Sequence, residues 1–216
     1  NVGYPGVDDT KLLPEVVIAI QDNFDIPLCL DSPNPSAIEA ALKVSAGRCL
    51  INSVNGKEES LRALIPVAKE YGAAIIGLCM DDEGITNDPG KRVSIIEKIT
   101  DRAVAAGIRA EDVIADPLAM AVSAEPQACV VTLDTIRLLH RKLGLNITMG
   151  ASNISFGLPD RESLNSAFMT LAIYCGVTCP IANPEKSTSA ARAADLVLGR
   201  DDFAIRCVAC FQRCDS

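Results

Sequence analysis

The sequence predicts an α/β protein of the TIM-type (β/α)8 barrel class, and two observations carry this prediction. Short apolar runs alternate with longer stretches in which apolar residues recur at helical spacing, a pattern typical of βαβ units on a parallel sheet. The composition, 49% hydrophobic and 22% charged, is that of a chain that buries a large core. Because barrels of roughly 200–250 residues commonly form one domain, the 216 residues are expected to form a single domain, 1–216.

Six strands are expected, each rich in Ile, Val, Leu, Cys or Ala: Pro27–Leu30, Arg48–Ile51, Ala73–Met80, Val113–Ala115, Asn146–Gly150 and Thr178–Ala182. Helices are expected at Asp9–Asn23, Pro35–Ala46, Lys57–Tyr71, Gly90–Ala106, Pro126–Leu143, Arg161–Cys175 and Glu185–Leu198. Their ends carry ordinary signals, such as Pro35 in a first turn and Gly47 after a last one.

A barrel of this class has eight strands, so the predicted set lacks the first two. The chain opens with Asn1-Val2-Gly3-Tyr4-Pro5-Gly6, which resembles a strand-to-helix loop without its strand. We therefore expect an N-terminally incomplete barrel domain, with roughly 50–60 residues upstream, the size of βαβ units.

Charge and hydropathy argue against two classes of function. The net charge is -8 and the basic residues are scattered, whereas binding to a nucleic-acid backbone relies on clustered Lys and Arg. The chain has no run of about 18 apolar residues and no signal-peptide order at its start. A cytoplasmic protein that binds neither nucleic acid nor membrane is expected.

The nine cysteines fall into two groups. Cys29, Cys49, Cys79 and Cys179 lie in or beside apolar runs, where a free thiol behaves as a small hydrophobe, so they are expected to be reduced core residues. The other group, in the C-terminal tail, has the spacing C-x2-C-x3-C and consists of Cys207, Cys210 and Cys214.

Two interpretations of this tail remain open. Three thiolates are one short of a closed metal or cluster site, and Cys175 or Cys179 could supply the fourth ligand. The simpler interpretation, which we favour, is a final amphipathic helix, Asp201–Arg213, without a metal. Its apolar face would then hold Phe203, Cys207, Cys210 and Phe211.

Polar residues follow strand after strand at the point where the apolar run ends. This gives Leu30-Asp31-Ser32, Ile51-Asn52-Ser53, Ala115-Asp116-Pro117 and Ser152-Asn153-Ile154. Each alone is typical of a helix N-cap or a turn. In a closed barrel, however, the carboxyl ends of the strands meet at one mouth, where barrel enzymes hold their active sites. Together the four positions predict a binding site.

The residue types fit a flat, polar heterocycle such as a pterin. A carboxylate accepts two parallel hydrogen bonds, here from a 2-amino group and the adjacent ring N–H, while an Asn can donate and accept on the remaining edge. Without a ligand these groups would be unpaired in an apolar mouth, which favours specificity for the aminopyrimidinone edge.

At these residues the sequence resembles the pterin-binding methyltransferases. They include methyltetrahydrofolate:corrinoid/iron-sulfur protein methyltransferase and the folate domain of cobalamin-dependent methionine synthase. The resemblance spans essentially the whole chain. Its most specific pieces are Asn1-Val2-Gly3, Leu28-Cys29-Leu30-Asp31-Ser32, Leu50-Ile51-Asn52-Ser53, Asp116-Pro117-Leu118 and the ten residues from Gly150 to Pro159.

The resemblance implies a role for each matching residue. Asp31, Asn52 and Asp116 would bind the pterin ring, with Asp116 facing its amino group. Asn153 would be both a pterin ligand and the catalytic residue, since the matching Asn of the family bonds near the methyl-bearing ring nitrogen and stabilises charge there. The further candidates for pterin binding are Asn1, Ser53, Gly150, Ser152 and Arg161.

The implied reaction moves a methyl group between methyltetrahydrofolate and the cobalt of a corrinoid. The chain has no corrinoid-binding motif, so a separate corrinoid protein would carry the cobalamin cofactor. Relatives by this resemblance are homodimers. The direction of transfer stays open.

Other chemistry-bearing residues have simpler interpretations. The single histidine, His140, lies in a predicted outer helix, where a solvated or capping role is expected. Asp81, Asp82 and Glu83 follow the third predicted strand and are expected to form a solvated acidic loop.

Two alternative functions were weighed. A dihydropteroate synthase-like enzyme would share the barrel and the pterin contacts. That enzyme type has a Lys and an Arg where this chain has Ser155-Phe156-Gly157-Leu158-Pro159, and an Arg-x-His element where this chain has Ile181-Ala182-Asn183-Pro184. A non-catalytic pterin or corrinoid accessory protein is the other alternative, although the Asp-x-His-x-x-Gly signature of corrinoid carriers is missing.

Overall fold

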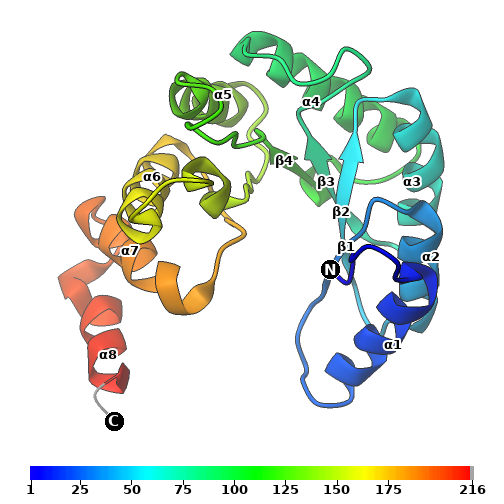
Figure 1. Cartoon of the computed structure of the whole chain (residues 1–216), viewed down its shortest axis with the longest axis horizontal. Coiled ribbons are helices and arrows are strands. Elements are labelled where there is room, and N and C mark those ends of the chain that lie inside the picture. Colours follow the sequence, from blue (N-terminus) through cyan, green and yellow to red (C-terminus); the bar gives the residue numbers. More distant parts are fainter. Residues whose placement is uncertain (215–216) are drawn as a thin grey trace. The chain divides into compact units, whose positions relative to one another are not determined.

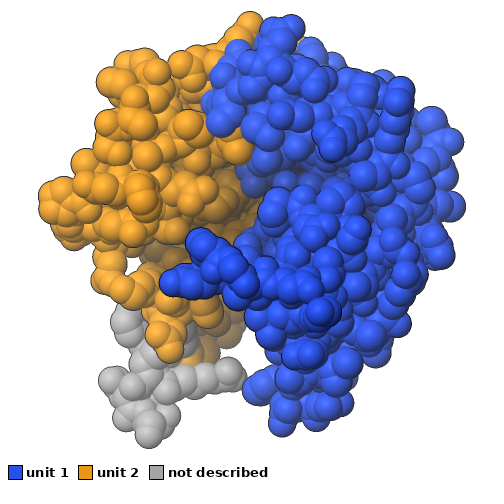
Figure 2. Space-filling view, turned by 45° about the vertical axis from the view of Figure 1, so that its right-hand side comes forward, with its two compact units in different colours: residues 1–86, 90–116 blue, residues 87–89, 117–216 orange. Residues whose placement is uncertain are grey.

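The computed structural model describes the backbone of residues 1–214 and the side chains as far as Ala209. The chain forms two compact units, shown in different colours in Figure 2. Unit 1 contains residues 1–86 and 90–116, and unit 2 contains residues 87–89 and the chain from 117 onward. Each unit is described in turn.

Unit 1 is built on a sheet of four parallel strands in the order β1-β2-β3-β4 (Figure 1). The strands are β1 (Cys29–Asp31), β2 (Leu50–Asn55), β3 (Ala74–Leu78) and β4 (Val113–Asp116). Strand order follows chain order because each strand is joined to the next through a helix. All four carboxyl ends therefore lie along the same edge.

Four helices and one short 3-10 turn belong to this unit: α1 (Asp9–Gln21), α2 (Pro35–Val44), α3 (Glu58–Glu70), α4 (Pro89–Ala105) and η1 (Ala110–Asp112). Local sequence explains α2 well. The Asn34 side chain accepts a hydrogen bond from the Ser36 N–H, and Pro35 occupies the first turn, where its missing N–H costs nothing. Ala37, Ile38, Ala41 and Leu42 recur at helical spacing and are buried.

The core of unit 1 lies on both faces of the sheet. Ile75 and Ile76 of β3 are consecutive, so they point to opposite faces, and both are fully buried. Gly77 follows them, and a Cβ there would lie 3.3 Å from a methyl carbon of Ile99 on α4. The missing side chain thus permits close packing between α4 and β3.

Unit 2 is mainly helical. Its elements are α5 (Ala128–Lys142), η2 (Ala151–Ser155), α6 (Arg161–Cys175), α7 (Pro184–Val197), η3 (Asp202–Ala204) and α8 (Ile205–Cys214). Helix α6 contacts α5, α7 and η2. Its inward face buries Phe168, Met169 and Ala172, and Ile136 and Leu139 of α5 are fully buried as well. The helices and the first four strands of the sequence prediction are confirmed, with shifts of a few residues at their ends.

The prediction of strands at Asn146–Gly150 and Thr178–Ala182 is wrong in detail. The two segments run in parallel, but only the Gly150–Ile181 pair forms a β-bridge between them. The Thr178 and Cys179 amides both donate to the Ile147 carbonyl, and Pro180 has no N–H to donate. The ladder resumes where Ile181 donates to Met149, so the pairing is too irregular for regular strands.

The cysteine prediction holds for two of its four core residues. Cys49 and Cys79 are buried, whereas Cys29 and Cys179 are exposed. Cys29 begins β1, which pairs only with β2 in the described sheet, and Cys179 lies in the irregular segment just described. Position within an apolar run therefore did not determine burial.

The final helix forms, but it begins at Ile205 and therefore leaves out Phe203, one residue of the predicted apolar face. Phe203 is 96% exposed and precedes α8, in a left-handed backbone conformation (φ 56°) that ends any continuous helical face. Cys207 is half-buried. The side chains of Cys210, Phe211 and Cys214 lie outside the described residues. Among the side chains that are described, no group of three His, Cys, Asp or Glu could hold a metal ion.

None of the helices that the structure describes is long and apolar enough to cross a membrane.

Asp112 connects the segments that precede two strands of unit 1. Its buried carboxylate accepts hydrogen bonds from Arg109 (2.9 and 3.1 Å) and pairs with Nη2 of Arg48, just before β2, at 2.5 Å. Hydrogen bonds from Arg109 and then Arg48 hold the pKa of Asp112 below its ordinary value of 3.8. Such a group stabilises the fold above the unfolded pKa, and the contribution is lost as the pH falls through the lower folded pKa.

The substitution Asp112→Asn should lower the free energy of unfolding at pH about 7 by about 1–3 kcal/mol, since it removes charged hydrogen bonds from a buried site. Urea unfolding at several pH values would measure this loss. The difference from wild type should shrink as the pH falls below about 4, where the carboxylate of the unfolded chain takes up a proton, and it should vanish once the pH is below the lowered pKa of the folded protein. The matched control is Glu111→Gln, because Glu111 lies in the same turn but is exposed. An equal loss in both variants, or one independent of pH, would contradict this account.

Candidate functional site

Two of the predicted ligands are direct neighbours at the carboxyl edge of the sheet. Asp31 ends β1 and is paired in parallel register with Asn52 of β2, and both side chains are partly exposed. The Ser32 N–H donates to the Asn52 carbonyl at 3.3 Å, which continues the ladder past the end of β1. A carboxylate and a carboxamide are thus held side by side by backbone pairing.

The loop after β1 is tied down by Asp9, a residue that sequence reasoning missed. One carboxylate oxygen of Asp9 accepts from the Ser32 hydroxyl at 2.6 Å, and the other accepts from the Asn34 side-chain amide at 3.0 Å. The Ser32 oxygen in turn accepts from the Asn34 N–H. These bonds link the start of α1 to the loop directly after Asp31, and the side chain of Asp31 remains available to a ligand.

Asp31 and Asn52 line an open cavity of about 460 Å³ within unit 1. Its wall continues through Ser53, the predicted additional ligand, to Asn55 and Lys57 at the start of α3. The Asn52–Ser53 peptide bond is cis. Two carboxylates, one ammonium group and several neutral donors and acceptors therefore surround a space the size of small-molecule sites.

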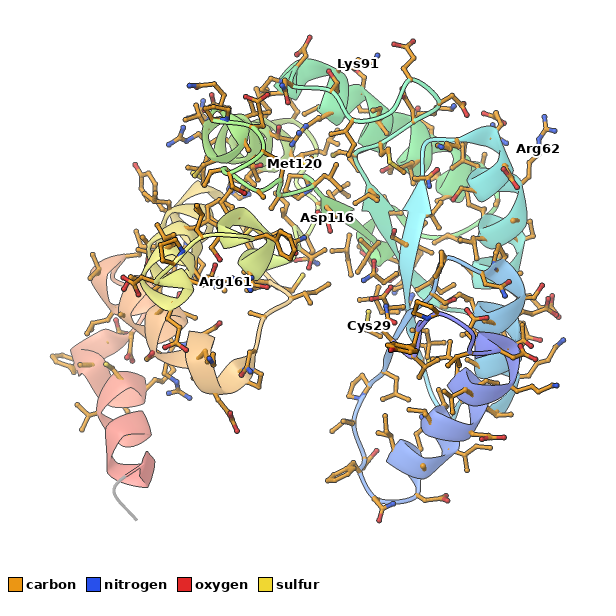
Figure 3. All side chains as sticks on the ribbon, in the orientation of Figure 1. Cys29, Arg62, Lys91, Asp116, Met120 and Arg161 are labelled. Carbon is orange, nitrogen blue, oxygen red and sulfur yellow. The ribbon has the colours of Figure 1, made fainter. Side chains whose placement is uncertain are left out.

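Asp116, the third predicted ligand of unit 1, ends β4 (Figure 3). It is paired in register with Leu78 of β3, and its carbonyl accepts from the Cys79 N–H at 3.1 Å. Its side chain is buried and has electrostatic partners in the Arg92 guanidinium and the Cys79 thiol. Burial raises the pKa of Cys79 far above its ordinary value, so this thiol is neutral. Unit 1 thus places Asp31, Asn52 and Asp116 at the same edge of one sheet.

The remaining predicted residues lie in unit 2. Asn153 is exposed in η2, and its side-chain amide folds over Gly150, where a Cβ would lie only 2.8 Å from Nδ2 of Asn153. Glycine at position 150 therefore makes room for this amide. The Asn153 side chain forms no hydrogen bond within the described residues, so both of its polar atoms are available.

Arg161 braces the loop that carries Asn153. From the first turn of α6 (Figure 3), its Nε donates to the Ser155 hydroxyl at 3.0 Å and its Nη2 to the Ser152 carbonyl at 2.9 Å. The guanidinium also lies 6.0 Å from the centre of the Phe156 ring, within cation–π distance. Ser152 and Arg161 are thus structural supports of the loop, and they also line a second cavity of about 310 Å³ with Asn165 and Lys186.

Three other positions have local roles. The Asn1 side chain accepts from the Gly3 N–H at 2.8 Å and is otherwise exposed. His140 is exposed in the last turn of α5, where a basic residue complements the carbonyl end of the helix. In the acidic loop, Asp81 accepts from the Glu83 N–H, and Glu83 pairs with Lys91.

The convergence of Asp31, Asn52, Asp116 and Asn153 on one ring joins residues of both units and stays a prediction.

A protein-family model described as pterin binding enzyme matches residues 4–183. The chain belongs to this family. The match includes Asp31, Asn52, Asp116 and Asn153, and it ends at Asn183, directly before α7. The family resemblance drawn from the strand-end motifs is confirmed.

Among its curated relatives, the chain is 30% identical over 189 residues to methylcorrinoid:tetrahydrofolate methyltransferase of Eubacterium limosum, which covers 84% of this chain and 69% of that protein. It is 31% identical over 198 residues to methionine synthase of Mycobacterium tuberculosis, covering 86% of this chain but only 16% of the enzyme. This family member is thus similar to one part of that much longer protein.

Solved structures confirm the fold class. Dihydropteroate synthase of Yersinia pestis, in complex with a pterine-sulfa conjugate, matches with a TM-score of 0.71 at 17% identity, covering 91% of this chain and 80% of that one. The 7,8-dihydropteroate synthase of Vibrio fischeri matches with a TM-score of 0.68 at 20% identity, covering 93% and 79%. At such low identity the likeness shows an α/β fold of the (β/α)-barrel class and does not assign a reaction.

The Asp9 network generates a prediction for the loop after β1. Asp9→Ala should remove about 1–2 kcal/mol from the free energy of unfolding, because the Ser32 hydroxyl and the Asn34 amide both lose their acceptor. Thermal unfolding would measure the loss, and amide hydrogen exchange should speed up at the N–H groups of Ser32, Asn34 and Ser36. Glu15→Ala, at an exposed position of the same helix, is the matched control and should change neither. Unchanged exchange in Asp9→Ala would show that the network does not hold the loop.

Proposed function

We propose that this chain is a methyltransferase that moves a methyl group between methyltetrahydrofolate and the cobalt of a corrinoid carried by a separate protein. The observation that carries the proposal is the shared sheet edge of Asp31, Asn52 and Asp116, of which the first two open onto one cavity. The relative named methylcorrinoid:tetrahydrofolate methyltransferase, similar over 84% of the chain, supports the choice of reaction. Both directions of transfer would use the same site.

The chemistry of these side chains supports a pterin ligand. Asp116 is buried, so its carboxylate would bind the 2-amino group and the ring N–H in a place where water competes little. Asp31 and Asn52 are neighbours in the sheet register and would form hydrogen bonds with polar atoms on another part of the ring. Ser53 and Asn1 are proposed as further contacts.

Asn153 is proposed as the catalytic residue. The ring nitrogen that carries the methyl group is a poor leaving group until a proton or a strong hydrogen bond stabilises the charge left on it. The Asn153 amide can donate such a bond, and its side chain is exposed without a partner among the described residues. Gly150, Ser152 and Arg161 would act by shaping and supporting this loop.

The proposal extends to the setting of the reaction. We propose a single barrel domain over residues 1–216, a corrinoid protein as partner, a homodimer and a cytoplasmic location. The match to methionine synthase covers only 16% of that enzyme. The proposal therefore does not include the synthesis of methionine.

Dihydropteroate synthesis is the second candidate, because the structural neighbours reported above are dihydropteroate synthases. It requires stabilisation of a departing diphosphate, for which a cationic clamp is the usual means. The segment Ser155–Pro159 contains no basic residue, and Arg161 is occupied with the Ser152 carbonyl and the Ser155 hydroxyl. Product formation from a pterin diphosphate and p-aminobenzoate would distinguish this reaction from methyl transfer.

Asn153→Ala should reduce the rate of methyl transfer between methyltetrahydrofolate and free cobalamin by about 10²–10³-fold, because it removes a hydrogen bond made mainly in the transition state. The Kd for methyltetrahydrofolate should change by less than about tenfold. Single-turnover spectroscopy of the cobalamin in both directions measures the rate. Asn146→Ala, at an exposed position of the same unit, is the control. An undiminished rate in Asn153→Ala would remove this residue from the mechanism.

Asp116→Asn should weaken the binding of methyltetrahydrofolate by about 10²-fold, since the amide presents a donor where the pterin also donates. Isothermal titration calorimetry at constant pH measures the affinity. Asp134→Asn is the control, because Asp134 lies on α5 and pairs with the neighbouring Arg137. If Asp116→Asn binds the folate as tightly as wild type, the proposed pterin site is wrong.

A further inference from the structure

The cavity that Asp31 and Asn52 line extends well beyond these two residues. Its volume of about 460 Å³ is also bounded by the segment after β2 and the start of α3, from which Lys57, Ser60 and Ala63 line it. Drug-sized ligands occupy pockets of about 300–1,000 Å³, so this space can hold a larger molecule than a two-ring heterocycle. A ligand bound at Asp31 and Asn52 can therefore reach further groups of unit 1.

Lys57 is the ammonium group of this cavity, and it has no protein partner. Its side chain is half-buried, and its Nζ forms neither a hydrogen bond nor an ion pair among the described residues. Every other lysine of unit 1 forms an ion pair or a hydrogen bond. Because a charge that is partly removed from water is stabilised by an opposite charge, this unpaired ammonium group suits an anionic ligand.

The backbone at Lys57 is held in place by neighbouring elements. The Gly56 N–H donates to the Met80 carbonyl at 2.7 Å, and the Gly56 carbonyl accepts from Lys98 of α4 at 2.8 Å. The Lys57 N–H donates to the Asn55 side chain at 3.0 Å. The backbone from which the Lys57 side chain extends is thus fixed at the cavity wall without a ligand, which lowers the entropic cost of binding.

The same cavity has an apolar wall. Pro33 and Pro35, which follow β1, contribute to it, as do Ala63 and Leu64 of α3. Such side chains offer carbon surface to an aromatic ring, which gains free energy by leaving water. Polar groups suited to a heterocycle, an apolar wall and one ammonium group therefore line one space.

Methyltetrahydrofolate has three parts that match these three features. Its pterin ring is joined through a p-aminobenzoyl group to a glutamate, so a polar heterocycle, an aromatic ring and carboxylates follow one another. Asn52 belongs to β2, and Lys57 is the N-cap residue of the helix that follows this strand. One short segment of the chain would therefore contact both ends of the ligand.

We infer that Lys57 binds the glutamate carboxylate of methyltetrahydrofolate, while the apolar wall of the same cavity holds the p-aminobenzoyl ring. Lys57 thus makes the site selective for folates over pterins that have no glutamate. This inference rests on the proposed function and adds a second recognition point to its site.

The acidic residues at the start of α3 do not neutralise Lys57. Glu58 is paired with Lys98 and Arg102 of α4. Glu59 lines the cavity but is exposed, and it forms no ion pair with Lys57, since residues two positions apart at a helix start do not face each other. The Lys57 charge is therefore available to a ligand, and removal of the Glu59 charge should favour an anion in the cavity.

The test compares tetrahydrofolate with 6-methyltetrahydropterin, which lacks the p-aminobenzoylglutamate, by isothermal titration calorimetry. Lys57→Met should weaken the binding of tetrahydrofolate by about three- to tenfold, because a partly exposed ion pair is lost, and should leave the binding of the pterin unchanged. The loss should shrink as salt rises from about 0.05 M to about 1 M. Glu59→Gln should strengthen the binding of tetrahydrofolate. Arg62→Met, at an exposed arginine of the same helix (Figure 3), is the control and should bind both ligands as wild type does.

The two ligands separate the possible failures. Wild-type affinity of Lys57→Met for tetrahydrofolate, or an equal loss of affinity for both ligands, would overturn the role of Lys57 and leave the proposed function standing. A wild-type protein that binds neither ligand would overturn the proposed function, and this inference with it. If Lys57→Met does not fold, the salt dependence of the wild-type protein decides. Binding that weakens with salt for tetrahydrofolate alone would support the inference, and the same salt dependence for both ligands would contradict it.

Discussion

Parallel pairing of β1 to β4 is the constraint on which the arrangement of the candidate site depends. In a parallel sheet whose strands follow chain order, every strand delivers its last residue to the same edge. Asp31, Asn52 and Asp116 are separated by long stretches of sequence, yet the register sets Asp31 opposite Asn52 and Asp116 opposite the last residue of β3. Slippage by one residue would turn these side chains to the other face of the sheet.

In each unit, a polar network holds a loop that lies outside the sheet. Asp9 fixes the loop after β1 in unit 1, and Arg161 fixes the loop that contains Asn153 in unit 2. In each case a charged side chain is satisfied by groups next to a proposed ligand-binding residue. Among the proposed ligand-binding residues, Asn153 has polar side-chain atoms without a partner within the described residues. Asp31 and Asn52 line an open cavity. Separate residues therefore provide rigidity and recognition, which is the arrangement that a preorganised site requires.

The buried groups of unit 1 show how packing changes chemistry. Cys79 and Arg92 lie near one another in surroundings that remove water, and burial moves the pKa of the thiol up and that of the guanidinium down. The thiol is therefore neutral, while the arginine keeps its charge, because a guanidinium is not deprotonated in proteins. At the surface the same two side chains would have ordinary pKa values.

The sequence by itself determined the class of fold, the helices, the first four strands and the strand-end residues Asp31, Asn52 and Asp116. Alternating apolar periodicity and N-cap residues such as Asn34 are local signals, and they do not depend on distant contacts. It did not determine that Asp9 holds the loop after β1, that Arg92 is buried, that Cys29 and Cys179 are exposed, or that the last two predicted strands form an irregular pair. Only the tertiary structure decided these features. Burial and long-range hydrogen bonding are set by which segments meet in space, and an isolated Asp or Arg in a helix carries no record of its partner.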